Sequence, residues 1–202
     1  FHLVAPWMLQ RQDWECLHAS AVLTEAGVVA FCGPAGRGKS TLARACQERG
    51  ALAYADDAVP FLIRDGLAMA ASIPQQSRLR QPAASWFQEP PGARANGSNG
   101  REVVYDLEPT LRPLSAVYWL EPMSDAALRI EPVPAAEGFR LLLGEAYCLT
   151  LDDLACNRKM VRNYLSLASL SPVFRLWFSP GREGIPSLLD RLEQNQRTIA
   201  HA

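Results

Sequence analysis

The chain has 202 residues, 49% of them hydrophobic, and its 20 Lys and Arg residues nearly balance its 21 Asp and Glu residues, for a formal net charge of -1. This size predicts a single domain, residues 1–202, with a core large enough to need no stabilising cross-links. Near-neutrality argues against a general nucleic-acid binder, and no apolar run approaches the length of a membrane span or a signal peptide. We therefore expect a cytoplasmic protein with no nucleic-acid or membrane partner.

Five cysteines are scattered along the chain without a C-x-x-C pair: Cys16, Cys32, Cys46, Cys148 and Cys156. Three of them lie in apolar runs. This pattern favours small buried hydrophobic side chains in a reducing compartment over a disulfide or zinc framework.

The first 50 residues predict strands, a glycine-rich loop and a helix. Residues 1–13 have apolar residues without a clean period and are expected to form a strand or an irregular lead-in. Residues 14–23 predict a strand, 24–27 a turn and 27–32 a buried strand. A helix is expected over 40–49, with Gly50 as its stop.

The loop between that strand and helix fits the phosphate-binding pattern G-x-x-x-x-G-K-[ST] at every defined position. Its glycines let successive backbone N–H groups face an anion, and the start of the following helix adds partial positive charge. Lys39 can reach the β- and γ-phosphates, and the Ser40 hydroxyl can complete the coordination of Mg²⁺. A glycine-rich turn that matches by chance is the alternative, which the strand–loop–helix setting disfavours. The predicted nucleotide-binding residues are Gly33, Pro34, Ala35, Gly36, Arg37, Gly38, Lys39, Ser40 and Thr41.

The middle of the chain predicts a strand over 51–55 and a hairpin of 60–64 and 67–72, which turns at Asp65-Gly66. A short helix is expected around 83–87. Residues 90–100 are the most loop-like of the chain, and form either a solvated connection or a substrate lid.

The last hundred residues predict three strands followed by alternating helices and a strand. The strands are expected over 103–107, 114–120 and 127–133, where Val, Tyr, Trp and Leu are frequent. Apolar residues at helical spacing predict helices over 135–147 and 152–170. A last strand is expected over 173–178, a last helix over 185–194, and a frayed tail over 197–202.

Two neighbouring acids, Asp56 and Asp57, follow the strand after the loop helix. In an open α/β sheet that edge faces the ligand crevice. Two adjacent side chains at a strand end point in different directions, so one acid can serve the metal while the other meets an acceptor hydroxyl. A polar strand end in solvent is the alternative. His18, in the middle of a predicted strand, is by itself more typical of a structural histidine.

Arginines are the other candidates for phosphate contacts. Arg78, Arg80, Arg101 and Arg112 can each stabilise a transferring phosphoryl group or bind an acidic acceptor. A solvated surface arginine is the alternative at every one of these positions, and Arg112, beside a strand start, is the preferred candidate.

Three elements in this order resemble the catalytic core of HPr serine kinase/phosphorylase. They are Leu17-His18-Ala19-Ser20-Ala21, the phosphate loop, and Arg49-Gly50 leading to Ala55-Asp56-Asp57. The resemblance covers about residues 14 to 60, and a looser one at 112–120 and 172–176 links the chain to shorter HPr-kinase-related proteins found beside peptide-tailoring genes. It implies an α/β phosphate-loop domain of the HPr kinase and phosphoenolpyruvate carboxykinase type, with a mixed, antiparallel-rich sheet flanked by helices.

The resemblance also implies roles. Asp56 is the expected acid/base for an acceptor serine, Asp57 helps Ser40 to hold Mg²⁺, and His18 packs against the acid pair; with Lys39 these are the expected catalytic residues. Ala19 stands where the bifunctional enzymes have Gly, and the later glutamate-bearing segment is not recognisable. These departures weaken the case for phosphorylase activity and for HPr as the substrate.

The resulting hypothesis is a Mg²⁺-ATP-dependent serine kinase with a protein or peptide acceptor. The resemblance extends to kinases that phosphorylate the C-terminal serine of lasso-peptide precursors. A catalytically silent nucleotide-binding module and a small-molecule kinase are the alternatives. HPr kinases form hexamers, so a homo-oligomer is compatible with the resemblance, which does not by itself transfer the assembly.

Overall fold

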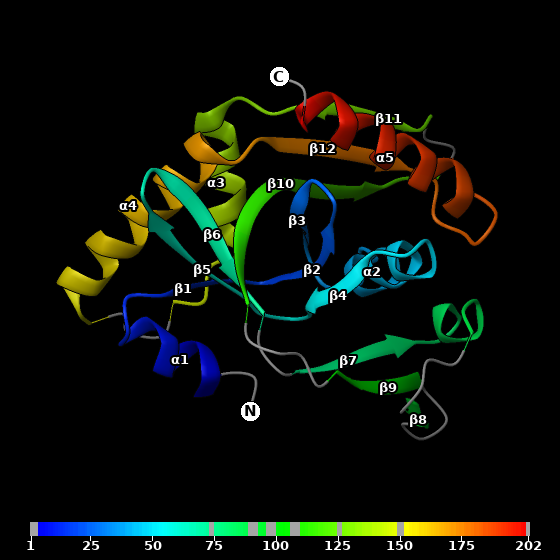
Figure 1. The fold of residues 1–202 in the computed structure, drawn as a ribbon, viewed down its shortest axis with the longest axis horizontal. Helices are drawn as coiled ribbons and strands as arrows, with labels where there is room; N and C mark the ends of the chain where they lie inside the picture. Colours follow the sequence, from blue (N-terminus) through cyan, green and yellow to red (C-terminus); the bar gives the residue numbers. More distant parts are fainter. Residues whose placement is uncertain are drawn as a thin grey trace.

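The computed structural model describes residues 4–72, 75–88, 93–95, 100–105, 110–124, 127–148 and 152–200 (Figure 1). For residues 4–5, 75–78, 80, 93–95 and 100–105 it describes the backbone only. Over this part of the chain, a curled nine-stranded mixed sheet is flanked by helices, and a second sheet has three strands. The predicted α/β class with a mixed, antiparallel-rich sheet is confirmed.

The main sheet contains a path of seven strands in the order β1-β5-β6-β10-β3-β2-β4. Strand β12 lies beside β10, and β11 lies beside β12. Only the pairs of β10 with β3 and with β12 are parallel among these strands. The bounds are β1 (Glu15–Leu17), β2 (Ala19–Thr24), β3 (Gly27–Cys32), β4 (Leu52–Ala55), β5 (Val59–Arg64), β6 (Leu67–Ala71), β10 (Leu111–Pro122), β11 (Arg129–Pro132) and β12 (Val173–Phe178).

The second sheet has the order β7-β9-β8, with β7 (Gln75–Arg80), β8 (Ala93–Ala95) and β9 (Gly100–Tyr105). It lies beside α2 at the lower edge of the molecule in Figure 1. A single 3₁₀ turn, η1 (Ala83–Ser85), follows β7 and packs its Ala84 against the α2 side of the core.

Helices α2 to α5 form two layers on opposite faces of the main sheet (Figure 1). Alternate residues of β3 show this, because Val28 and Ala30 pack with the α3 and α4 layer, whereas Val29 and Phe31 pack with the α2 and α5 layer. Side chains of a strand alternate between faces, so a strand covered on both sides is apolar throughout. The helices are α1 (Val4–Gln10), α2 (Lys39–Glu48), α3 (Ala135–Gly144), α4 (Leu154–Leu170) and α5 (Ile185–Ala200).

Most predicted elements of the main sheet are present, including the β5–β6 hairpin that turns at Asp65-Gly66. The N-terminal prediction was wrong, because Val4–Gln10 form helix α1 and not a strand or an irregular segment. The predicted strand over 14–23 is divided into β1 and β2 at His18, which is therefore not in mid-strand.

Three further predictions need correction. The short helix expected at 83–87 is a single 3₁₀ turn, and the last helix continues to Ala200, so the tail is not frayed over 197–200. The expected loop over 90–100 contains strand β8, and its residues 90–92 and 96–99 lie outside the described residues.

The cysteine prediction is confirmed in its main point. All five cysteines are free thiols, and Cys16, Cys32 and Cys46 are buried, whereas Cys148 is half-buried and Cys156 is exposed. Among the residues described, no helix combines the length and the apolar character that crossing a membrane requires.

Candidate functional site

The phosphate loop joins the end of β3 to the start of α2. At Gly33 the backbone φ is 136°, and an added Cβ would lie 3.3 Å from the Leu120 carbonyl oxygen of β10, so both conformation and space disfavour a larger residue. At Gly38, which precedes α2, φ is 96°, and its carbonyl accepts the Leu42 N–H at 2.8 Å. The loop therefore has the course that the motif predicts.

Lys39 is the buried cation of this loop. Its side chain is only 9% exposed, and its Nζ donates to the Gly33 carbonyl oxygen at 2.6 Å, so the ammonium group lies across the inside of the loop. Pro34, Ala35 and Gly36 are exposed at the tip. Arg37 lies outside the cradle and pairs with Glu121 of β10, with 3.6 Å between Nη1 and Oε2.

Two serines and an aspartate meet behind the loop. Ser40 Oγ donates to Asp56 Oδ1 at 2.9 Å, and Ser20 Oγ of β2 donates to the same oxygen at 2.5 Å. The two hydroxyl oxygens lie 3.3 Å apart, and Ser20 is fully buried. The first acid of the pair is thus held on the side of the phosphate loop. Thr41, next to Ser40, is half-buried.

The second acid faces another way. His18 Nε2 lies 3.3 Å from Asp57 Oδ1, and His18 Nδ1 lies 3.1 Å from Glu145 Oε2 at the end of α3. The hydrogen bond to Asp57, followed by that to Glu145, raises the pKa of His18 from 6.5 to about 9, although burial lowers it. His18 is therefore an imidazolium ion at neutral pH, with a carboxylate at each ring nitrogen.

The segment after α3 closes this side of the site. The Tyr147 hydroxyl donates to the Asp57 backbone carbonyl at 2.8 Å, and the Tyr147 N–H donates to the Cys16 carbonyl at 3.2 Å. Asp57 itself has a φ of 69°, in the left-handed region that Asp tolerates better than most residues. Tyr147 thus fixes the unusual backbone that directs the Asp57 carboxylate toward His18.

The structure brings all the predicted catalytic residues to one end of the β3–β2–β4 strands, but the acids are separated. Asp56 hydrogen-bonds the serine expected to bind the metal, and Asp57 pairs with the histidine. The resemblance gave Asp57 to the metal and Asp56 to the acceptor, and these roles stay a prediction.

Sequence reasoning missed three members of the site. Ser20 is a polar residue in the buried first part of β2, between Ala19 and Ala21, and that contrast was an available signal. Glu145 and Tyr147 follow helix α3 and lie far from His18 in sequence, so no local pattern indicated their role.

The arginine candidates are not brought into this site by any described contact. Arg112 is exposed on β10, opposite Ala70 of β6, and makes no hydrogen bond or ion pair with the site residues that the structure describes. The side chains of Arg78, Arg80 and Arg101 lie outside the described part.

The residues beside the loop fit a Mg²⁺ ion bound together with phosphates. The donors are oxygens, the Ser40 hydroxyl and the Asp56 carboxylate, which are the ligand type that Mg²⁺ prefers. Over the described residues, no three His, Cys, Asp or Glu side chains are grouped so as to hold a metal. Mg²⁺ commonly takes one or two carboxylates and completes its shell with phosphates and water.

No protein-family model matches this chain, and no curated protein matches it either. Among solved structures, the chain is similar to the HPr(Ser) kinase/phosphatase from Coxiella burnetii, with a TM-score of 0.46 and 14% identity. The match covers 93% of this chain and 99% of the other.

Proposed function

We propose that the protein is a Mg²⁺-ATP-dependent kinase that transfers the γ-phosphate to a serine hydroxyl of a protein or peptide. The observation that carries the proposal is the contact between the two halves of the site. Ser40 of the phosphate loop hydrogen-bonds Asp56, and the next residue, Asp57, is oriented by His18. Phosphoryl transfer requires a phosphate cradle, a bound metal and a group that orients the acceptor. The residues of this site can form the cradle, hold the metal and orient the acceptor.

On the donor side, the loop N–H groups and Lys39 bind the triphosphate. Ser40 and Asp56 would hold Mg²⁺, which supplies charge neutralisation at the β- and γ-phosphates when bound. Ser20 would orient the Asp56 carboxylate through its hydroxyl. ATP is the nucleotide implied by the resemblance.

On the acceptor side, Asp57 would accept the proton of the attacking serine. As the acceptor oxygen bonds to the γ-phosphorus, the bond from that phosphorus to the β–γ bridging oxygen breaks, and ADP leaves with the electron pair. His18 would hold the Asp57 carboxylate in position. The Asp57 side chain is 44% exposed, so an acceptor can reach it.

The acceptor proposed is a peptide, and the C-terminal serine of a lasso-peptide precursor is the specific candidate. This step is supported by the resemblance of 112–120 and 172–176 to the HPr-kinase-related proteins beside peptide-tailoring genes, and by the departures from the pattern of enzymes that act on HPr. A silent nucleotide-binding module would bind ATP without turnover, and a small-molecule kinase would label a metabolite.

The test is incubation with γ-labelled ATP, Mg²⁺ and a panel of serine peptides that includes a lasso-type precursor, with HPr and a metabolite extract as parallel acceptors. We expect label on a peptide serine, lost when that serine is replaced by alanine. Label only in metabolites would support the small-molecule kinase, and nucleotide binding without transfer to any acceptor would support the silent module.

A further inference from the structure

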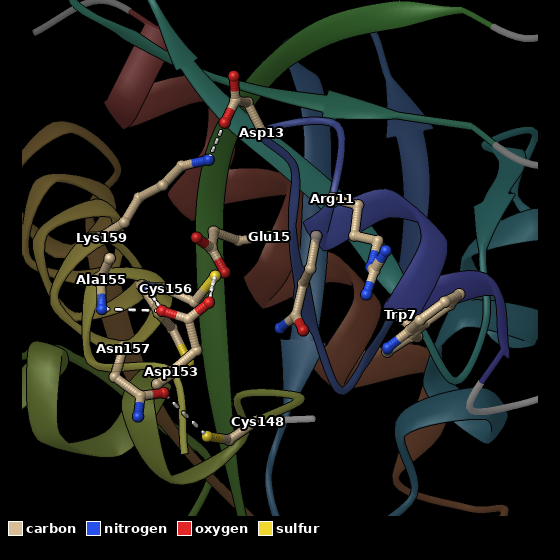
Figure 2. A pocket seen from close by; sticks show the side chains of 12 residues that line it. Trp7, Arg11, Asp13, Glu15, Cys148, Asp153, Ala155, Cys156, Asn157 and Lys159 are labelled. Atoms are coloured by element: carbon tan, nitrogen blue, oxygen red, sulfur yellow. Dashed lines mark hydrogen bonds and ion pairs between the residues drawn. The ribbon is translucent and has the colours of Figure 1, made fainter. Parts of the chain in front are cut away.

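A cavity of about 530 Å³ lies between helix α1 and the start of helix α4, behind the Asp57 side of the site. Figure 2 shows Trp7 of α1 and Arg11, which follows this helix, on one side of the cavity, and Asn157 and Lys159 of α4 on the other. Glu15, the first residue of β1, projects into it between these two walls. None of these residues takes part in the phosphate-transfer chemistry proposed above.

Glu15 is the buried charge of the cavity. Its residue is only 4% exposed, and its hydrogen bond in the described structure comes from the Asn163 side-chain amide, with 2.9 Å between Nδ2 and Oε1. A carboxylate at this depth is costly without a cationic partner. Burial raises the pKa of Glu15 above its ordinary value and the Asp13 carboxylate adds to this rise, although the Asn163 hydrogen bond and the positive charge of Lys159 lower it.

The other charged groups of the cavity already have partners. Lys159 forms an ion pair with Asp13 at the rim, and Figure 2 shows its side chain extended toward that residue. Arg11 lies over the Trp7 ring, 4.4 Å from the ring centroid. Asp153 accepts the Ala155 and Cys156 N–H groups as the cap of α4.

A second acceptor points to a ligand with hydrogen-bond donors. The side-chain amide nitrogen of Gln10 donates to the Tyr147 carbonyl, and its buried Oε1 has no hydrogen-bond partner among the described residues. Gln10 and Glu15 both line the cavity, so two buried oxygen acceptors belong to its wall, and Trp7 and Met160 supply apolar surface beside them. A donor-rich cation on an apolar stem matches this lining.

We propose that this cavity binds an arginine or lysine side chain of the peptide acceptor, with its cationic head at Glu15. The inference rests on the proposed function, since it assigns the cavity to the same acceptor that Asp57 receives. The segment after α3 connects the two places, because Tyr147 contacts Asp57 and the following residue, Cys148, lines the cavity.

The connection also sets a spacing. Glu15 begins β1 and His18 follows the last residue of this strand, so the chain between Glu15 and His18 spans at most about 10 Å. An extended acceptor of the same length would place the basic residue about three positions from the serine. The preferred acceptor therefore carries a basic residue about three positions away, on one side of the serine.

The test is calorimetric binding of capped serine peptides, without nucleotide, to the full chain. Each peptide has arginine or norleucine three positions before or after the serine, and is otherwise identical. We expect the better-placed arginine peptide to bind at least about tenfold more tightly than its norleucine counterpart. Glu15→Gln should abolish this preference, and Glu131→Gln, on exposed strand β11, should leave it unchanged.

Two further variants keep the result decisive if Glu15→Gln unfolds. Ala155→Trp fills the cavity from an exposed position on α4 and should remove arginine binding without loss of a buried contact. Lys159→Met removes a nearby cation that competes for Glu15, and should therefore strengthen the binding of the arginine peptide. Arginine binding that appears only in Lys159→Met would overturn the proposal, because Lys159 would then be the partner of Glu15.

The same peptides in the labelled-ATP assay separate this proposal from the function itself. Transfer to serine with no arginine preference, or a preference that persists in both Glu15→Gln and Ala155→Trp, would refute the cavity assignment and leave the kinase standing. Arginine-dependent binding with no transfer from ATP would refute the kinase and leave a binding site for basic peptides.

Discussion

The two halves of the site are built in different ways. The donor half is nearly continuous in sequence, because Gly33 to Ser40 supply backbone, cation and hydroxyl from one strand–loop–helix unit. The acceptor half combines His18 from the β1–β2 junction, Asp57 after β4, and Glu145 and Tyr147 after α3. Between these two halves, Ser20 and Asp56 hydrogen-bond each other, and Asp56 also accepts a hydrogen bond from Ser40 of the loop. A local sequence motif can bind a triphosphate because this ligand does not vary. The residues proposed to meet the acceptor, in contrast, are brought together only by the tertiary structure.

The largest effect is expected on the donor half, from Lys39→Met. The variant removes the buried ammonium that can reach the β- and γ-phosphates, so ATP affinity and any transfer should fall by about a hundredfold or more. Titration calorimetry with ATP measures the affinity, and Arg64→Met, on the exposed β5–β6 hairpin, is the matched control. Unchanged ATP affinity would show that the loop does not bind the triphosphate.

A second change tests the loop backbone. Gly33→Ala places a Cβ 3.3 Å from the Leu120 carbonyl at a φ of 136°, and should cost about 1–3 kcal/mol of unfolding free energy. Gly36→Ala at the tip, with φ 83° and no atom within 4 Å of the added Cβ, should cost only about 1 kcal/mol. Urea unfolding measures both variants. An equal cost would mean that the close approach of Leu120 does not constrain the loop.

The smallest effect concerns the acceptor half and its pH dependence. Because the pKa of His18 is raised in the folded protein to about 9, its contribution to stability is present below its ordinary value of 6.5 and is lost as the pH rises through about 9. Glu145→Gln removes one of the two carboxylates, so the pKa should fall and the loss should begin at lower pH. Titration of the His18 ring protons by NMR, with Glu131→Gln as control, measures the shift. A pKa that stays near 9 in Glu145→Gln would contradict the ion pair.

The contrast between the halves also explains what sequence could predict. The β3–loop–α2 unit and the β5–β6 hairpin depend on local signals, the motif glycines and Asp65-Gly66, and both were predicted correctly. Helix α1 was missed because seven residues carry too short a periodic pattern and no cap signal. The pairing of His18 with Glu145 joins residues far apart along the chain, and neither position carries a pattern that indicates the other.

The sequence predicted that Asp56 and Asp57 face different neighbours, but it did not indicate which of them faces the phosphate loop. Adjacent side chains at a strand end were expected to diverge, and they do, with Asp56 toward Ser40 and Asp57 toward His18. Which acid faces the phosphate loop depends on Ser20 and on the left-handed Asp57 backbone, and neither is evident from spacing.

The most direct test of this division is the Mg²⁺ dependence of ATP affinity in Asp56→Asn and Asp57→Asn, which requires no acceptor. If Asp56 belongs to the metal side, Asp56→Asn should lose most of the gain in affinity that Mg²⁺ confers, whereas Asp57→Asn should retain it. The opposite result, with the Mg²⁺ dependence lost in Asp57→Asn and kept in Asp56→Asn, would contradict the account and restore the roles implied by the resemblance.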